Sequence, residues 1–215
     1  MIIARFFRSS IGRKTVMAAS GAFLSLFLIV HGLGNATVFF GREAFLSYAS
    51  KLHSLGILIH FFEFFLLAVF LLHIGTGLTL FIENMNARPV RYQITKSSGG
   101  RTPGSRFMPY SGFVILIFLV VHLINFHFID HSVSIADVVR DIFSIPIYAF
   151  FYIAALAVLF FHISHGFWSF LQSFGVNHPV YDASIRKGAL VIAFLLSAIF
   201  IFIPLCTLLL ENFLL

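Results

Sequence analysis

The sequence predicts an all-α integral membrane protein, built as a bundle of five transmembrane helices. Of its 215 residues, 60% are apolar and only 10% are charged, against roughly 25% charged residues in an average soluble domain. So few charges cannot cover a soluble globule, and uncharged runs long enough to cross a bilayer recur along the chain. The composition therefore excludes a soluble enzyme, a nucleic-acid-binding protein and a disordered chain.

A transmembrane helix needs about 20 apolar residues to cross a hydrocarbon core of about 30 Å. Five runs meet this requirement, and Glu63 is the one charged residue well inside them. We expect the helices at residues 16–40, 55–82, 109–129, 144–173 and 188–211.

The first apolar run is expected to remain in the membrane, because it is too long for a secretory signal and no small-residue cleavage site follows it. Before it, residues 1–14 combine Ile and Phe with four basic residues, a pattern typical of an amphipathic segment on the membrane surface. Residues 94–105 are rich in Gly, Ser and Pro, which predicts a loop. We find no internal repeat in the sequence, and we expect residues 1–215 to form one transmembrane domain.

Basic residues are distributed unevenly between the two sides of the predicted bundle. The N-terminal segment and the loops at 83–107 and 172–187 hold eleven Lys and Arg residues, whereas the opposite side holds three. Because loops rich in Lys and Arg stay in the cytoplasm, the N-terminus is predicted to be cytoplasmic and the C-terminus to lie outside.

Ten histidines are present in this apolar chain. Three are expected in loops, His53, His131 and His178, and two near helix ends, His60 and His127, where water reaches them. The other five lie deep within predicted spans: His31, His73, His122, His162 and His165. A polar side chain inside a bilayer is expensive, and it therefore marks a candidate functional site.

Helix rise places four of the deep histidines at two levels. At about 1.5 Å per residue, His31 lies about 22 Å and His122 about 20 Å from the inner face. On the same estimate, His73 lies about 14 Å and His162 about 16 Å from that face. His165 follows His162 by three residues, about 60° around the helix, and spacing alone does not choose between them.

Two histidines on facing helices at one depth are what bis-histidine haem ligation requires, and two such pairs predict two stacked haems. The chain has no Cys-x-x-Cys-His and only one cysteine, so these haems would be b-type. Zinc is disfavoured because its sites usually take more than two protein ligands. Hydrogen bonding between helices is the alternative role for such histidines. Gly77 and Gly166 each follow a histidine by four residues, where they could admit a porphyrin or serve helix packing.

Longer motifs surround these histidines: FLIVHGLGN, FLLHIGTGL, FLVVHLINF and LFFHISHGFWSF. In order, spacing and setting, they resemble the cytochrome b membrane anchor of succinate:quinone oxidoreductases, the five-helix type with two haems. The opening SSIGRKTVMAASG and the stretch FFGREAFLSYASKLH are similar to the same family. The resemblance covers nearly the whole chain, and residues 1–215 would form a single transmembrane cytochrome b domain.

The resemblance implies a ligand set for the haem irons. His73 and His162 would hold the proximal, inner haem, and His31 and His122 the distal, outer haem. The pattern HxSxGxWSF at 162–170 favours His162 over His165.

The resemblance also implies partner subunits and a location in a bacterial inner membrane. A flavoprotein with FAD and an iron–sulfur subunit would dock on the cytoplasmic face, where succinate and fumarate interconvert. Electrons would pass through the two haems between the iron–sulfur clusters and a quinone, menaquinone or ubiquinone, near the distal haem. The dicarboxylate site would lie in the flavoprotein, and lipid would surround the helices of this chain.

Glu63 is a candidate for the quinone site, because it is the only carboxylate well within a predicted span. It lies eight residues into the second helix from the outside and could exchange protons with quinol. Its alternative role is an ion pair with His60 or with a helix neighbour. Some family members carry a glutamate two residues before the fourth-helix ligand for proton transfer. Phe160 stands at that position here, so that proton path is not expected.

Two other classes of protein fit parts of the pattern. Another dihaem cytochrome b, the anchor of a nitrate reductase or hydrogenase, concentrates its ligands on fewer helices, and the placement of one ligand on each of four helices argues against it. A transporter or assembly protein without haem would use the histidines to relay protons, and its preparations would be colourless.

Overall fold

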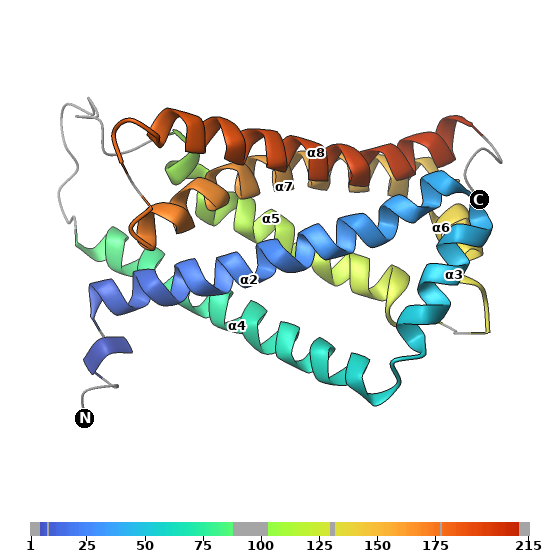
Figure 1. Ribbon diagram of the computed structural model, residues 1–215, viewed down its shortest axis with the longest axis horizontal. Coiled ribbons are helices and arrows are strands. Elements are labelled where there is room, and N and C mark those ends of the chain that lie inside the picture. The colour runs from blue at the N-terminus through green and yellow to red at the C-terminus, as the bar shows by residue number, and fades with distance from the viewer. Residues whose placement is uncertain (1–4, 8, 88–102, 130–131, 177, 211–215) are drawn as a thin grey trace.

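A computed structural model describes residues 5–7, 9–87, 103–129, 132–176 and 178–210. Within these residues the chain forms helices and no strand. Five helices are long and apolar enough to cross a membrane, so the predicted fold class, an all-α multi-pass membrane bundle, is confirmed (Figure 1). They are α2 (Ser10–Ala36), α4 (Ile57–Asn86), α5 (Pro103–Phe126), α7 (Pro146–Ser173) and α8 (Asp182–Leu209).

The spans extend further into their polar flanks than the apolar runs indicate. The helices α2, α5 and α8 each begin six residues earlier than predicted, at Ser10, Pro103 and Asp182. At the start of α2 the cause is a helix cap, because the Ser9 hydroxyl accepts a hydrogen bond from the Gly12 amide at 3.0 Å. In α5 the prediction took Pro109 for the helix start, but it lies inside the helix.

Two short helices join the spans at one end of the bundle. After a 3-10 turn, η1 (Thr37–Phe40), α3 (Arg42–His53) leads into α4, and α6 (Ile135–Phe143) leads from α5 into α7. They lie together at the end where α2 and α5 finish (Figure 1). His53 therefore ends a helix and does not lie in a loop as predicted, whereas His178 does lie between helices. His131 and most of the predicted loop at 94–105 fall outside the described residues.

Helix α4 is packed much less closely than the other spans. None of its thirty residues is buried, whereas α7 and α8 bury apolar side chains along their lengths. It rests mainly on α2 and has few contacts with α5. Most of the α4 surface therefore has no protein neighbour among the described residues.

The order of elements reveals an internal repeat that the sequence analysis did not find. The unit α2–α3–α4 consists of a span, a short helix and a returning span, and α5–α6–α7 repeats this order (Figure 1). Residues 17–31 and 108–122 are identical at seven of fifteen positions, and so are residues 67–81 and 156–170. The bundle is therefore two related units, followed by α8.

Candidate functional site

The first histidine pair brings α2 and α5 together toward the end of the bundle that carries α3 and α6. The ring centroids of His31 and His122 lie 6.0 Å apart, and the ring planes are perpendicular. Phe27 stacks on His31 at 5.2 Å, and Phe200 of α8 lies 5.6 Å from the same ring. Three more aromatic rings surround His122: Phe118, Phe126 and Tyr152. The structure thus brings together the two histidines that depth had paired.

The separation of this pair fits a metal ion bound between the rings. Metal–imidazole bonds of about 2 Å, as in zinc sites, place two opposed ring centroids about 6 Å apart. The Nδ1 atom of His122 is buried and has no hydrogen-bond partner among the described residues, although such buried atoms are normally satisfied. The Asn35 amide donates to the His31 carbonyl oxygen at 2.8 Å and is 3.4 Å from Nε2. If a metal bound to Nε2 of His31, only the 3.4 Å contact with Asn35 would be lost.

The second pair, His73 of α4 and His162 of α7, lies nearer the end of the bundle where α2 begins. Each ring contacts a serine through its Nδ1 atom, Ser20 at 3.1 Å from His73 and Ser111 at 2.9 Å from His162. All four paired histidines are half-buried.

The internal repeat relates the members of each pair to one another. His122 follows His31 by 91 residues and His162 follows His73 by 89, and these are the offsets that align the two units. A single prosthetic group between the units would therefore receive equivalent ligands from both sides. His31 with His122, and His73 with His162, are the residues that could each hold one bis-histidine haem.

His165 has different neighbours from His162. Its ring lies 5.6 Å from that of Trp168, and a Cβ atom at Gly104 of α5 would lie 3.1 Å from its Nδ1 atom. Of the two candidates on α7, His162 is the one whose Nδ1 atom contacts a serine, as Nδ1 of His73 does. This shared surrounding favours His162 over His165.

The predicted glycines have unlike surroundings. A Cβ atom at Gly77 would lie 3.4 Å from Met17 of α2, an ordinary van der Waals contact. At Gly166 such an atom would meet no other group within 4 Å, as at Gly75. Sequence reasoning missed Gly21 and Gly112, whose Cβ positions would lie 3.4 Å and 3.6 Å from the Cε1 atoms of His73 and His162.

Glu63 lies in a small polar cluster near the start of α4. Its carboxylate is 3.0 Å from His60 Nδ1 and 3.9 Å from Nδ1 of His127, which follows the end of α5. The predicted partner His60 is therefore present, and His127 is an addition. Glu63 is 42% exposed, so the cluster opens to the surroundings. In the second unit the equivalent position holds Tyr152, which is 3% exposed and accepts a hydrogen bond from Asn125.

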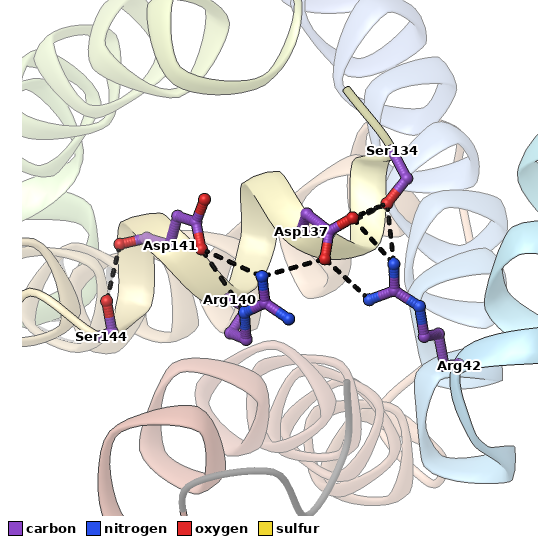
Figure 2. A network of polar contacts seen from close by, with 6 residues as sticks. All are labelled: Arg42, Ser134, Asp137, Arg140, Asp141 and Ser144. Carbon is purple, nitrogen blue, oxygen red and sulfur yellow. Dashed lines mark hydrogen bonds and ion pairs between the residues drawn. The ribbon is translucent and has the colours of Figure 1, made fainter. Parts of the chain in front are cut away.

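A polar network joins α3 to α6 at this end of the bundle, as Figure 2 shows. The Arg42 guanidinium donates to both carboxylate oxygens of Asp137, at 2.9 and 2.8 Å, and Ser134 donates to the same carboxylate at 2.5 Å. Arg140 pairs with Asp137 and with Asp141. The hydrogen bond from Arg42 holds the pKa of Asp137 well below its usual range, and the same bond raises the pKa of Arg42.

Comparisons with protein-family models, curated proteins and solved structures returned no match for this chain. Among the described residues, no group of three or more His, Cys, Asp or Glu side chains is placed to hold a metal ion. A bis-histidine haem site takes only two protein ligands, so the absence of larger groups does not bear on the histidine pairs.

Proposed function

We propose that this chain is the membrane-anchor cytochrome b of a succinate:quinone oxidoreductase, a succinate dehydrogenase or fumarate reductase. The observation that carries the proposal is the pairing of the deep histidines. The rings of His31 and His122 lie 6.0 Å apart, and both pairs match equivalent residues of the two units. The particular complex is inferred from the motifs around these histidines, which resemble those of that family.

Haem with two axial histidines supplies one-electron transfer and has no open position for oxygen. The side chains of this protein would set the conditions for that transfer. His31 and His122 would hold one haem, and His73 and His162 the other. Phe27 and its aromatic neighbours would exclude water from the first site. Two levels along the bundle would let electrons travel between a quinone on one side and iron–sulfur clusters on the other.

The partner subunits would dock on the basic side of the bundle. Eleven of the fourteen Lys and Arg residues lie in the N-terminal segment and in the two loops on that side, which the positive-inside rule assigns to the cytoplasm. A flavoprotein carrying FAD and an iron–sulfur subunit would bind there, in a bacterial inner membrane. The dicarboxylate chemistry would take place in the flavoprotein.

The haem content of the purified complex tests this proposal. We expect a pyridine haemochrome assay and a reduced-minus-oxidised spectrum to show two b haems per copy of this chain. A folded complex without haem would reject the electron-transfer function and favour a transporter or assembly protein. Two haems in a complex that lacks succinate and fumarate turnover would reject the particular complex and retain the cytochrome.

We further propose that Glu63 accepts protons from quinol near the distal haem. A quinol loses protons together with electrons when it is oxidised, so the site needs a base that the quinone can reach. Glu63 is exposed, pairs with His60 and His127, and stands where the other unit has the buried Tyr152. The two units therefore differ at this position, and one unit alone offers a carboxylate.

The variant Glu63→Gln tests this role. We expect quinone-linked turnover to fall about 10²-fold, the usual contribution of a general base, while both haems stay bound. Glu43→Gln is the matched control, because Glu43 lies in the short helix α3, outside the spans, and should keep full turnover. Full turnover in Glu63→Gln with intact haems would remove Glu63 from the mechanism.

A further inference from the structure

Each histidine of the second pair has a serine partner on the other span of its own unit. Ser20 Oγ of α2 lies 3.1 Å from His73 Nδ1 of α4, and Ser111 Oγ of α5 lies 2.9 Å from His162 Nδ1 of α7. The repeat makes these contacts equivalent, because Ser20 and Ser111 each stand eleven residues before a histidine of the first pair.

The backbone around the serines indicates the direction of these hydrogen bonds. Ser20 Oγ lies 2.8 Å from the Val16 carbonyl oxygen, and Ser111 Oγ lies 3.0 Å from that of Phe107. A hydroxyl has a single proton to donate, and in a helix serine commonly donates it to the carbonyl four residues back. Its lone pairs then accept the Nδ1–H group of the imidazole.

This direction selects one tautomer of the imidazole. A neutral imidazole carries its proton on one nitrogen and a free lone pair on the other. With the proton held on Nδ1, the Nε2 atoms of His73 and His162 are free to bind a metal. If the serine donated instead, the proton would stand on Nε2 and block it.

A glycine follows each serine and faces the same ring. The Cβ position at Gly21 lies 3.4 Å from His73 Cε1, and that at Gly112 lies 3.6 Å from His162 Cε1. Each imidazole is thus contacted by a serine hydroxyl and lies close to the backbone of the glycine that follows this serine. In the first pair, His122 has no such support, since its Nδ1 atom has no partner in the described part of the chain.

We propose that the two Ser–Gly dipeptides, Ser20–Gly21 and Ser111–Gly112, are positioning sites for the ligands of the inner haem. Each hydroxyl holds its imidazole as the Nδ1–H tautomer and orients Nε2 toward the iron. The inference rests on the proposed haem function and adds residues that are not themselves ligands. A hydrogen bond from the outer ring nitrogen makes a histidine ligand more basic, which stabilises the oxidised haem and lowers its midpoint potential.

Redox titration of the purified complex tests the proposal with Ser20→Ala and Ser111→Ala. We expect each variant to raise the midpoint potential of the same haem and to leave that of the other haem unchanged. Ser20→Thr keeps a hydroxyl and should restore the original potential. Ser25→Ala is the matched control on α2, because Ser25 Oγ donates to the Gly21 carbonyl oxygen at 2.7 Å and has no histidine contact; it should shift neither haem.

The outcomes separate the failure of this inference from the failure of the proposed function. Two haems with unchanged potentials in both alanine variants would overturn the inference and leave the function standing. Equal shifts of both haems, or the same shift in Ser25→Ala, would also overturn it. A folded complex without haem would overturn both.

A second measurement reads the tautomer directly and does not depend on haem. Nitrogen NMR of the full chain in lipid without haem, with ¹⁵N-labelled histidine, distinguishes Nδ1–H from Nε2–H rings. We expect His73 and His162 to be Nδ1–H, and Ser20→Ala to change the signal of His73 alone. An Nε2–H signal from either residue in the unsubstituted chain would overturn the inference.

Discussion

At the scale of single residues, the surroundings of two histidines on α7 decide which one can share a ligand site with α4. His162 contacts Ser111, the equivalent of the serine that contacts His73, whereas His165 lies against Trp168 and the backbone at Gly104. We therefore expect His162→Ala to lose one haem and His165→Ala to keep both. The haem-to-protein ratio of the purified complex measures the difference. Loss of haem in His165→Ala alone would show that the ligand is misassigned.

The four paired histidines could be predicted because a deep histidine is costly in a bilayer and helix rise fixes its depth. The serine partners of His73 and His162 could not. A serine in a membrane helix commonly bonds to its own backbone, as Ser25 does, and nothing in the sequence marks Ser20 as different. Its contact with His73 joins residues that are 53 positions apart, so it becomes visible only when α2 and α4 are packed.

At the scale of elements, the link between α3 and α6 ties the two units together at one end of the bundle. The Arg42–Asp137 pair is its centre, with two hydrogen bonds in parallel. Paired hydrogen bonds of this kind between Arg and a carboxylate give geometric specificity as well as stability. Helix α6 also begins here, because Ser134 accepts a hydrogen bond from the Asp137 amide.

The pH dependence of this link follows from the lowered pKa of Asp137. A carboxyl whose pKa falls on folding stabilises the folded state above its unfolded pKa, about 3.9 for Asp, and loses that contribution as the pH decreases further. We expect Asp137→Asn to lower the unfolding temperature at pH 7, and the difference from the unsubstituted chain to shrink as the pH falls below about 4. Thermal unfolding in detergent at both pH values measures this.

Asp141→Asn is the control for that experiment. Asp141 is exposed and pairs only with Arg140 of its own helix, at 3.4 Å, so its loss should change the unfolding temperature little. If both variants lowered the unfolding temperature equally, the link between α3 and α6 would add no more stability than an exposed ion pair. If the difference in unfolding temperature between Asp137→Asn and the unsubstituted chain stayed constant on acidification, the charge of Asp137 would not be its cause.

Hydropathy located all five spans but neither short helix. Long apolar runs stand out because a lipid-facing helix is apolar all round, whereas α3 and α6 are short and carry charged residues. The spans α2, α5 and α8 also start outside the apolar runs. At α2 the Ser9 cap fixes the helix end, which hydropathy does not detect.

At the scale of the whole molecule, the repeat explains why the histidines occur in pairs. Two related units, each with one of the paired histidines on its first span and one on its second, supply equivalent residues to each pair. The sequence concealed this relation because the offset changes from 91 to 89 between the first and second spans, and fewer than half of the aligned positions are identical. The shared topology of the units made it visible.

Sharing of each haem between the two units gives a test of this architecture. We expect His31→Ala and His122→Ala to remove the same haem, because each supplies one of its two axial ligands. The double variant should therefore lose no more haem than either single variant, one of the two bound. Difference spectra and haem-to-protein ratios of the purified complexes measure this. If the two single variants lost different haems and the double variant lost both, the ligands would be paired within units and the proposed arrangement would be wrong.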